Sequence, residues 1–309
     1  MNVVVSYWSA NVVALAAYLV VAVTHLLGMR DAATSARRRG RSLPPGLLAQ
    51  AVIFQLGLLL VVLALVSPMG YWSYRFIWVR NMQDVVLAIM APALIVLGAP
   101  WLPLRDGLGL GGRGHHPGED ESGPAATGDS EDADRAGSGR PVWRALPICV
   151  TAAFCVVWWG WHLPGPFDAA LSSPLIYAAQ VVTYLAAGIA LWLQLIGSRP
   201  LSPQLAPLNR IALVLAVAVS GTVLGLIRAY GPGAAYPAYL GLGRHAAAVV
   251  SDQQAGGAIL WVFPLIPLSI VAVALAVRWL EDEESGATEA DFDRLLKHKS
   301  AWPSRPGLR

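Results

Sequence analysis

The sequence predicts an all-α integral membrane protein, a polytopic bundle of seven transmembrane helices. Of its 309 residues, 56% are hydrophobic and only 13% are charged, and the mean hydropathy is +0.54. A water-soluble domain usually carries about 25% charged residues and shorter apolar runs. Seven runs reach the roughly 20 residues that a helix needs to cross a bilayer. They lie at 7–29, 47–68, 76–97, 144–161, 174–196, 208–230 and 253–280.

The basic residues predict the orientation of the bundle, because short cytoplasmic loops carry an excess of arginine and lysine. Such residues gather in the connection after the first span, in the connection after the third span and in the C-terminal tail. The N-terminal segment and the loop 163–173 have none. We therefore expect the N-terminus outside and the C-terminus in the cytoplasm, as an odd number of spans requires.

Composition also divides the chain into segments. Residues 1–280 form the predicted seven-span membrane domain, and 281–309 form a cytoplasmic tail. The polar, glycine-rich and acidic insertion at about 106–139 cannot bury enough apolar surface to order itself, so we expect a disordered cytoplasmic loop there. The two cysteines, Cys149 and Cys155, have neither a CxxC nor a same-face helical spacing, which argues against a disulfide or a thiolate metal site.

Charge and composition limit the partners and the cellular location. The formal net charge of +3 comes with basic residues in loops and in the tail. Nucleic-acid binding would need them clustered on one face. We expect membrane lipid around the bundle and no nucleic acid. Frequent arginine, rare lysine and many alanines and glycines are typical of a GC-rich bacterial genome, which predicts a multi-pass protein of the bacterial inner (plasma) membrane.

The third span carries Arg80 and Asp84 near its start. Their spacing of four residues puts both side chains on one helix face. An ionised group in a lipid-facing helix costs about 2.5–3.5 kcal/mol at mid-span, so such residues usually face the interior of a bundle. The alternative is that the two charges only neutralise each other and serve packing.

With this orientation, nearly every unusual polar residue falls at the outer end of a span or in an outer loop. The candidates for an outer polar pocket, besides Arg80 and Asp84, are His162, Asp168, Tyr177, Gln180, Asp252, Gln253 and Gln254. Each has a plainer interpretation: His162 as an interfacial histidine, Asp252 as a helix N-cap, and the tyrosines as belt aromatics. Their shared location is the argument for a site.

Several strings together resemble one family. They are WWGWHLP followed by FDAAL, APALIVLGAP at the end of the third span, SGTVLG in the sixth, YPAY in the last outer loop and SDQQAGGAILW at the start of the seventh. This set, which runs from about 18 to 280 without the acidic loop, resembles the CtaG family. Its members are seven-span bacterial proteins associated with assembly of haem–copper cytochrome c oxidases.

The chain resembles a divergent member that lacks most of the family histidines. The family usually has a histidine pair, HMxxH, entering the third span, where Arg80 and Asp84 stand here, and a second pair where Tyr177 and Val181 stand. Imidazole and thioether groups suit copper, whereas arginine cannot ligate a metal and repels a cation.

Four residues match the family pattern. They are His162, Asp252, Gln253 and Gln254. The resemblance makes His162 and Asp252 the candidate metal ligands, with the two glutamines fixing orientation.

The resemblance implies a membrane accessory factor for cytochrome c oxidase biogenesis that assists copper delivery. Its partners would be oxidase subunits or a copper carrier, and copper is the cofactor to consider. The alternative is a small-ion or proton transporter, in which paired intramembrane charges form a pathway. An outer pocket closed below by Leu, Val and Ile favours binding over transport. No enzymatic activity is expected, because His162 and Asp168 have no serine or cysteine nucleophile at matched depth.

Overall fold

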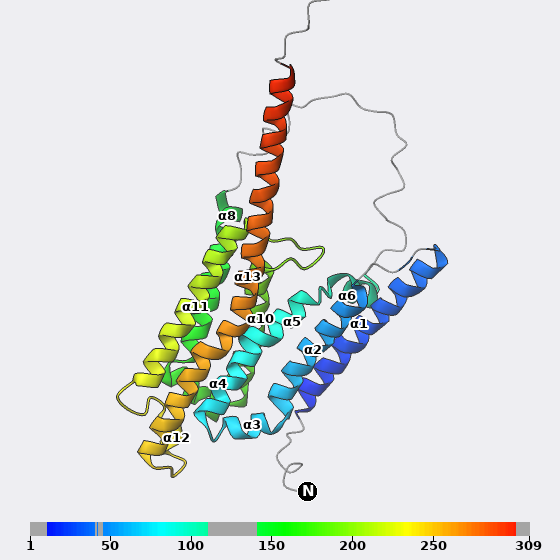
Figure 1. Cartoon of the computed structure of the whole chain (residues 1–309). Coiled ribbons are helices and arrows are strands. Elements are labelled where there is room, and N and C mark those ends of the chain that lie inside the picture. Colours follow the sequence, from blue (N-terminus) through cyan, green and yellow to red (C-terminus); the bar gives the residue numbers. More distant parts are fainter. Residues whose placement is uncertain (1–10, 41, 43–45, 111–140, 301–309) are drawn as a thin grey trace, which may run out of the picture.

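The computed structural model describes residues 11–40, 42, 46–110 and 141–300, and for 141–144 and 285–300 it describes the backbone. Every regular element in this part of the chain is a helix, apart from an isolated β-bridge between Ser198 and Leu201 (Figure 1). The long helices are α1 (Val12–Arg38), α2 (Leu47–Val66), α8 (Pro141–Trp161), α10 (Pro174–Leu195), α11 (Pro207–Tyr230) and α13 (Ala246–Ser300). The short helices are α3 (Pro68–Ser73), α6 (Trp101–Gly107), α9 (Pro164–Ser172) and α12 (Pro237–Leu240).

A further long segment consists of α4 (Ile77–Val85), the π-helical turn η2 (Val86–Met90) and α5 (Ala91–Leu97). In total, 6 of the described helices are long and apolar enough to cross a membrane, and up to 7 if α8 and α9, which meet at a bend of 68°, count as one span. The prediction of an all-α membrane helix bundle is confirmed. Its orientation stays a prediction.

Most of the predicted spans agree with the helices to within a few residues, but the first and the last helices are longer than predicted. α1 continues to Arg38, whereas the sequence predicts an end at 29. α13 begins at Ala246 and continues to Ser300, whereas the sequence predicts a span over 253–280. Figure 1 shows its C-terminal part projecting beyond the other helices, at the end opposite α3 and α12. Residues 281–300 of the predicted tail thus continue this helix. Most of the predicted acidic loop and residues 301–309 lie outside the described part of the chain, and the domain boundaries stay a prediction.

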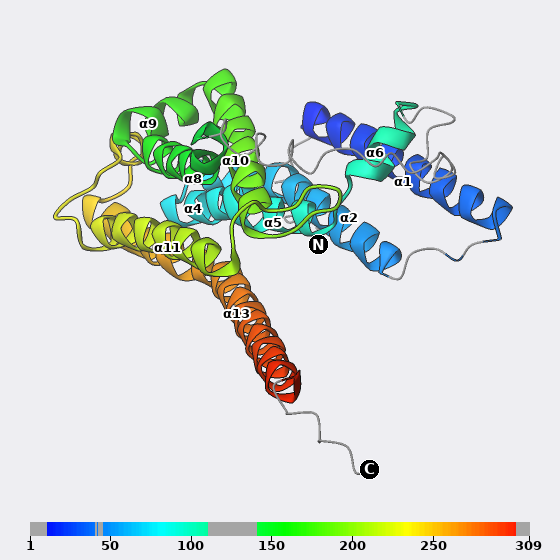
Figure 2. The ribbon, with the colours of Figure 1, turned by 90° about the horizontal axis from the view of Figure 1, so that it is seen from above.

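The α4–η2–α5 segment is the centre of the bundle. Of its apolar window 78% is buried, against 17–39% in the five other spanning helices. Figure 2 shows α8, α10, α11 and α13 around one side of this segment, with α1, α2 and α6 on its other side. The polar side chains of this segment are therefore surrounded mainly by protein and not by lipid.

The π turn of this segment has a local cause in Pro92. Proline has no N–H, so it cannot donate to the carbonyl of Ala88, four residues earlier. The helix widens, and the N–H of Ala91 bonds to the carbonyl of Val86, five residues earlier. The neighbouring carbonyl of Ile89 accepts a hydrogen bond of 2.9 Å from the indole Nε1 of Trp192. A side chain of α10 thus satisfies a backbone carbonyl at this irregular turn, as a membrane interior requires.

Glycines allow α11 and α13 to pack in backbone contact. A Cβ at Gly225 would lie 2.7 Å from the carbonyl oxygen of Gly257, and one at Gly257 would lie 2.6 Å from that of Gly225. Small residues of this kind let membrane helices approach closely. This contact matters for the site because α11 and α13 carry several of the residues that close it.

We predict that Gly225→Ala destabilises the bundle by about 1–3 kcal/mol, because the added methyl overpacks this interface. The matched control is Gly221→Ala, the same change one turn earlier, where the nearest atom to the new Cβ is 3.7 Å away. Thermal unfolding of both variants in detergent measures the difference. Equal midpoints would show that the two helices separate without cost.

Candidate functional site

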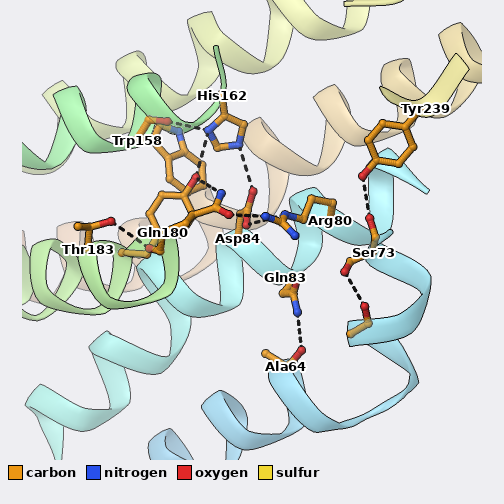
Figure 3. Close-up of polar contacts among 12 residues, drawn as sticks. Ala64, Ser73, Arg80, Gln83, Asp84, Trp158, His162, Gln180, Thr183 and Tyr239 are labelled. Carbon is orange, nitrogen blue, oxygen red and sulfur yellow. Dashed lines mark hydrogen bonds and ion pairs between the residues drawn. The ribbon is translucent and has the colours of Figure 1, made fainter. Parts of the chain in front are cut away.

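Four polar side chains from three parts of the chain meet inside the bundle (Figure 3). Arg80 and Asp84 come from α4, His162 from the bend between α8 and α9, and Gln180 from α10. None of them is more than 1% exposed. We call these four residues the buried cluster. The sequence predicts an outer pocket lined by them; the structure brings them together, but as a sealed group.

Arg80 is the largest member of the buried cluster. Its Nη2 donates to Oε1 of Gln180, and its Nε lies 3.7 Å from Oδ1 of Asp84. Its guanidinium carbon lies 4.7 Å from the ring centroid of Tyr177 and 5.8 Å from that of Phe167. The cation is therefore held by one amide, one carboxylate and two aromatic faces.

The contacts of His162 determine its tautomer. Its Nδ1 lies 2.7 Å from the carbonyl oxygen of Trp158. Because a carbonyl only accepts, we assign the proton to Nδ1. The other nitrogen, Nε2, then faces Oδ2 of Asp84 at 3.8 Å. An imidazole nitrogen and a carboxylate oxygen thus lie next to each other beside Arg80.

Several atoms of the buried cluster make no hydrogen bond within the described chain. They are Nε and Nη1 of Arg80, Oδ2 of Asp84 and Nε2 of His162. A buried polar group without a partner costs about 1–3 kcal/mol, and more when it is charged. Buried polar atoms of this kind point to a binding, catalytic or strained position, or to a bound water or ion.

A cap of α9, α12 and the loops beside them separates the buried cluster from solvent. Its apolar centre includes Phe167 and Tyr236, whose rings stack at 4.0 Å. The hydroxyl of Tyr236 donates to the carbonyl of His162 at 3.1 Å, and that of Tyr239 donates to the carbonyl of Ser73 at 2.7 Å. Burial raises the pKa of both tyrosines, so their hydroxyls stay protonated as donors. We call the end of the bundle with α3, α9 and α12 the capped end.

Two further contacts fasten the cap. Oδ2 of Asp168 accepts from the N–H of Ala238 at 3.2 Å, which joins α9 to α12. Nη2 of Arg228 donates to the carbonyl of His162, and its guanidinium carbon lies 4.9 Å from the ring centroid of Tyr236. Asp168 therefore belongs to the cap and not to the buried cluster.

Asp252 caps a helix, but a different one from the helix that the sequence suggests. α13 begins at Ala246, so Asp252 is not its N-cap. Its carboxylate instead accepts from the N–H groups of Ile77 and Trp78, at 3.0 and 3.1 Å, and so caps α4. Oδ2 also pairs with Nη1 of Arg244 at 2.6 Å. α4 makes no side-chain capping bond of its own, so Asp252 satisfies N–H groups at its start that would otherwise lack a partner.

The two glutamines after Asp252 have different environments. Oε1 of Gln253 accepts from the N–H of Ala235 at 2.7 Å, and its Nε2 donates to the carbonyls of Arg228 and Gly233, at 3.2 and 3.1 Å. Gln253 therefore ties the loop after α11 to α13. Gln254 is exposed and does not join the polar residues.

The residues present do not fit a copper site. Both oxygens of Asp252 are engaged by α4 and Arg244, while His162 faces Asp84. In the described residues no three or more His, Cys, Asp or Glu side chains are grouped so that they could hold a metal ion. Joint metal ligation by His162 and Asp252 stays a prediction, and their separate partners give it no support.

The positions where the family resemblance places histidines do converge. Arg80, Asp84 and Tyr177 lie together, as their contacts above show. Val181 packs against the apolar core. These side chains thus lie where the resemblance places histidines, but they include a guanidinium in place of an imidazole.

On the side of the buried cluster that faces away from the cap, the α4–η2–α5 segment is apolar. The five residues that follow Asp84 are buried: Val85, Val86, Leu87, Ala88 and Ile89. They pack with residues such as Leu191, Leu260 and Leu268 in one hydrophobic core. No polar side chain continues the cluster along this part of the described segment.

Sequence reasoning left Arg228, Arg244, Tyr236 and Tyr239 out of the candidate site. Their location in the sequence could have indicated them, since all four fall in the same predicted outer region as the candidate residues. What the spacing could not reveal is most of their partners, because their hydrogen bonds to His162, Arg75 and Ser73 join residues far apart in sequence.

We predict that Asp252→Ala lowers stability by about 0.5–2 kcal/mol, the usual cost of losing a helix cap. Gln254→Ala, two positions away and exposed, is the control and should change little. Hydrogen exchange at the first turn of α4 and thermal unfolding in detergent measure the effect. Unchanged exchange at Ile77 and Trp78 would contradict the capping role.

We also predict that Asp84→Leu costs about 3–5 kcal/mol, because it leaves the guanidinium of Arg80 buried without its anion. Replacing both partners, as Arg80→Met with Asp84→Leu, should recover most of this loss. Unfolding of the two single variants and the double variant in detergent completes the cycle. A double variant no more stable than Asp84→Leu would show that the two charges are not coupled.

Comparison with known proteins identifies the family. A family model described as cytochrome c oxidase caa3 assembly factor (Caa3_CtaG) matches residues 30–282, which is most of the chain. No curated protein and no solved structure matches. The match begins within α1 and ends just past the apolar part of α13, so it covers the buried cluster, the cap and the Asp252–Gln253 contacts. The chain belongs to the family of cytochrome c oxidase caa3 assembly factors.

Proposed function

We propose that this assembly factor acts by binding. In this proposal its capped end faces the outside of a bacterial inner membrane and contacts a subunit of a cytochrome c oxidase during biogenesis. The protein performs no catalysis itself. The buried cluster and the contacts of Asp252 and Gln253 keep the capped end in one shape, so that it presents a preformed surface to the oxidase.

The observation that carries this proposal is the uneven distribution of polar groups. The cap, the buried cluster and the Asp252–Gln253 contacts all lie toward one end of the bundle, and the segment below them is packed with Val, Leu and Ile. The loop 163–173 at that end carries no lysine or arginine, which supports an outward orientation.

Copper delivery, in this proposal, is assisted without copper being held in the buried cluster. The cluster contains a guanidinium, and a fixed cation disfavours a metal ion beside it. A copper carrier could dock on the same surface as the oxidase subunit. Its docking would change the copper content of the oxidase without copper binding to this chain.

The transport alternative has less support. Paired intramembrane charges are present, but a pathway needs polar groups or water through the whole membrane. The residues after Asp84 are apolar and buried, from Val85 to Ile89. A binding role fits a site that is closed below.

Deletion of the gene tests the assembly role. We predict lower cytochrome c oxidase activity and lower haem–copper content in the membranes, with normal levels restored by the intact chain. Repeating the measurement with added copper separates the two partners: a defect rescued by copper points to the carrier, and one not rescued points to the oxidase subunit. Unchanged oxidase under all conditions would remove the proposal.

Surface variants then locate the contact. Leu163 and Leu242, at the capped end, are 51% and 46% exposed, and Leu201, in the loop before α11, is 46% exposed. We expect Leu163→Arg or Leu242→Arg to reduce oxidase activity in the complemented strain, because a charge buried in an interface without a partner is costly to desolvate. Leu201→Arg is the matched control at the opposite end. Equal losses in all three would place the contact elsewhere.

A further inference from the structure

Three side chains of the buried cluster lie next to one another with part of their hydrogen-bonding capacity unused (Figure 3). Oδ2 of Asp84 lies 3.8 Å from Nε2 of His162, and Oδ1 of the same carboxylate lies 3.7 Å from Nε of Arg80. Oδ2, Nε2, and both Nε and Nη1 of Arg80 are buried and make no hydrogen bond within the described chain. Two donor atoms and two acceptor atoms are therefore unpaired in the same buried place.

The two acceptor atoms cannot pair with each other. Nδ1 of His162 carries the proton, because it donates to the carbonyl of Trp158, so Nε2 has only a lone pair to offer. The carboxylate oxygen of Asp84 also only accepts. Their separation of 3.8 Å is moreover longer than the about 2.7–3.2 Å of a direct hydrogen bond. Both atoms need a donor that the described chain does not supply.

The chemistry of the unpaired atoms selects the ligand. An anion would accept from the guanidinium, but it would lie against the carboxylate and offer no hydrogen to the imidazole. A cation would lie beside the positive charge of Arg80 and be repelled. A neutral molecule that both donates and accepts satisfies every group, and water is the smallest such molecule. Buried waters typically make about three hydrogen bonds to polar groups that otherwise lack partners.

We propose that the buried cluster binds a water molecule. The water donates one hydrogen to Oδ2 of Asp84 and the other to Nε2 of His162, about 2.8 Å from each, and its oxygen accepts from an unpaired N–H of Arg80. It thereby links α4 to the bend between α8 and α9 at the point where the two acceptors cannot bond directly. This inference goes beyond the proposed docking function and does not rest on it.

His25 provides a matched control within the same chain. Its side chain is as buried as that of His162, at 1% against 0% exposed. Its ring packs on that of Phe54, with the centroids 4.4 Å apart, and its Nδ1 lies 3.3 Å from Nε2 of Gln55. Neither His25 nor Gln55 has an unpaired buried atom of the kind found in the cluster, so we expect no bound water there.

X-ray radiolysis of the full chain in detergent tests the proposal. Ionising a bound water produces a hydroxyl radical that oxidises the side chain beside it, and mass spectrometry measures the oxidation of each histidine. A radical scavenger in the bulk solvent removes radicals that form outside the protein. We expect oxidation of His162 that persists with the scavenger, and none at His25. No oxidation of His162, its loss with the scavenger, or equal oxidation of His25 would each overturn the proposal.

A double variant then ties the water to the cluster. Arg80→Met with Asp84→Leu removes two of the three groups that hold the water, so the oxidation of His162 should be lost. Gln254→Ala, at an exposed position outside the cluster, should keep it. Persistent oxidation of His162 in a folded double variant would overturn the proposal. If that variant does not fold, the unchanged protein decides alone. The oxidase measurements in the deletion strain report on the proposed function separately.

Discussion

Burying a guanidinium at the centre of an apolar bundle is the constraint on which this structure depends. Arg80 sits on the most buried spanning segment of the described chain, and its side chain is fully buried. The charge requires a carboxylate, an amide oxygen and aromatic faces from α4, α9 and α10. The relative positions of these helices are therefore specified by polar chemistry as well as by apolar packing, which in lipid supplies little directional information.

The cap follows from the same constraint. A charged cluster near one end of a membrane protein must be closed off if its charges are to stay paired, and the bend between α8 and α9 folds Phe167 over Arg80. The cap is then tied down by side chains that bond to backbone groups: Tyr236 and Tyr239 to carbonyls, Asp168 to an N–H. Contacts of this type join loops to helix ends, where backbone groups lack partners within the helix.

Asp252 and Gln253 form a short motif whose contacts are structural. Asp252 caps α4, the helix that carries Arg80, and Gln253 holds the loop that leads into the cap. The motif thus acts at a distance from the surface that we propose meets the oxidase. Its value to an assembly factor lies in keeping that surface preformed, because ordering a loop on binding reduces affinity.

The fold class, the approximate spans and the family could be predicted from the sequence, because length, hydropathy and motif order are properties of the linear chain. The sequence also identified Arg80, Asp84, His162 and Gln180 as residues of one region. How these residues are used depends on the packed bundle: the region is sealed, Asp252 caps a helix whose Ile77 lies 175 residues away, and Gln254 is exposed. Spacing along one helix tells which side chains share a face, but the partner opposite that face depends on how the helices pack, and packing is set by all of them together.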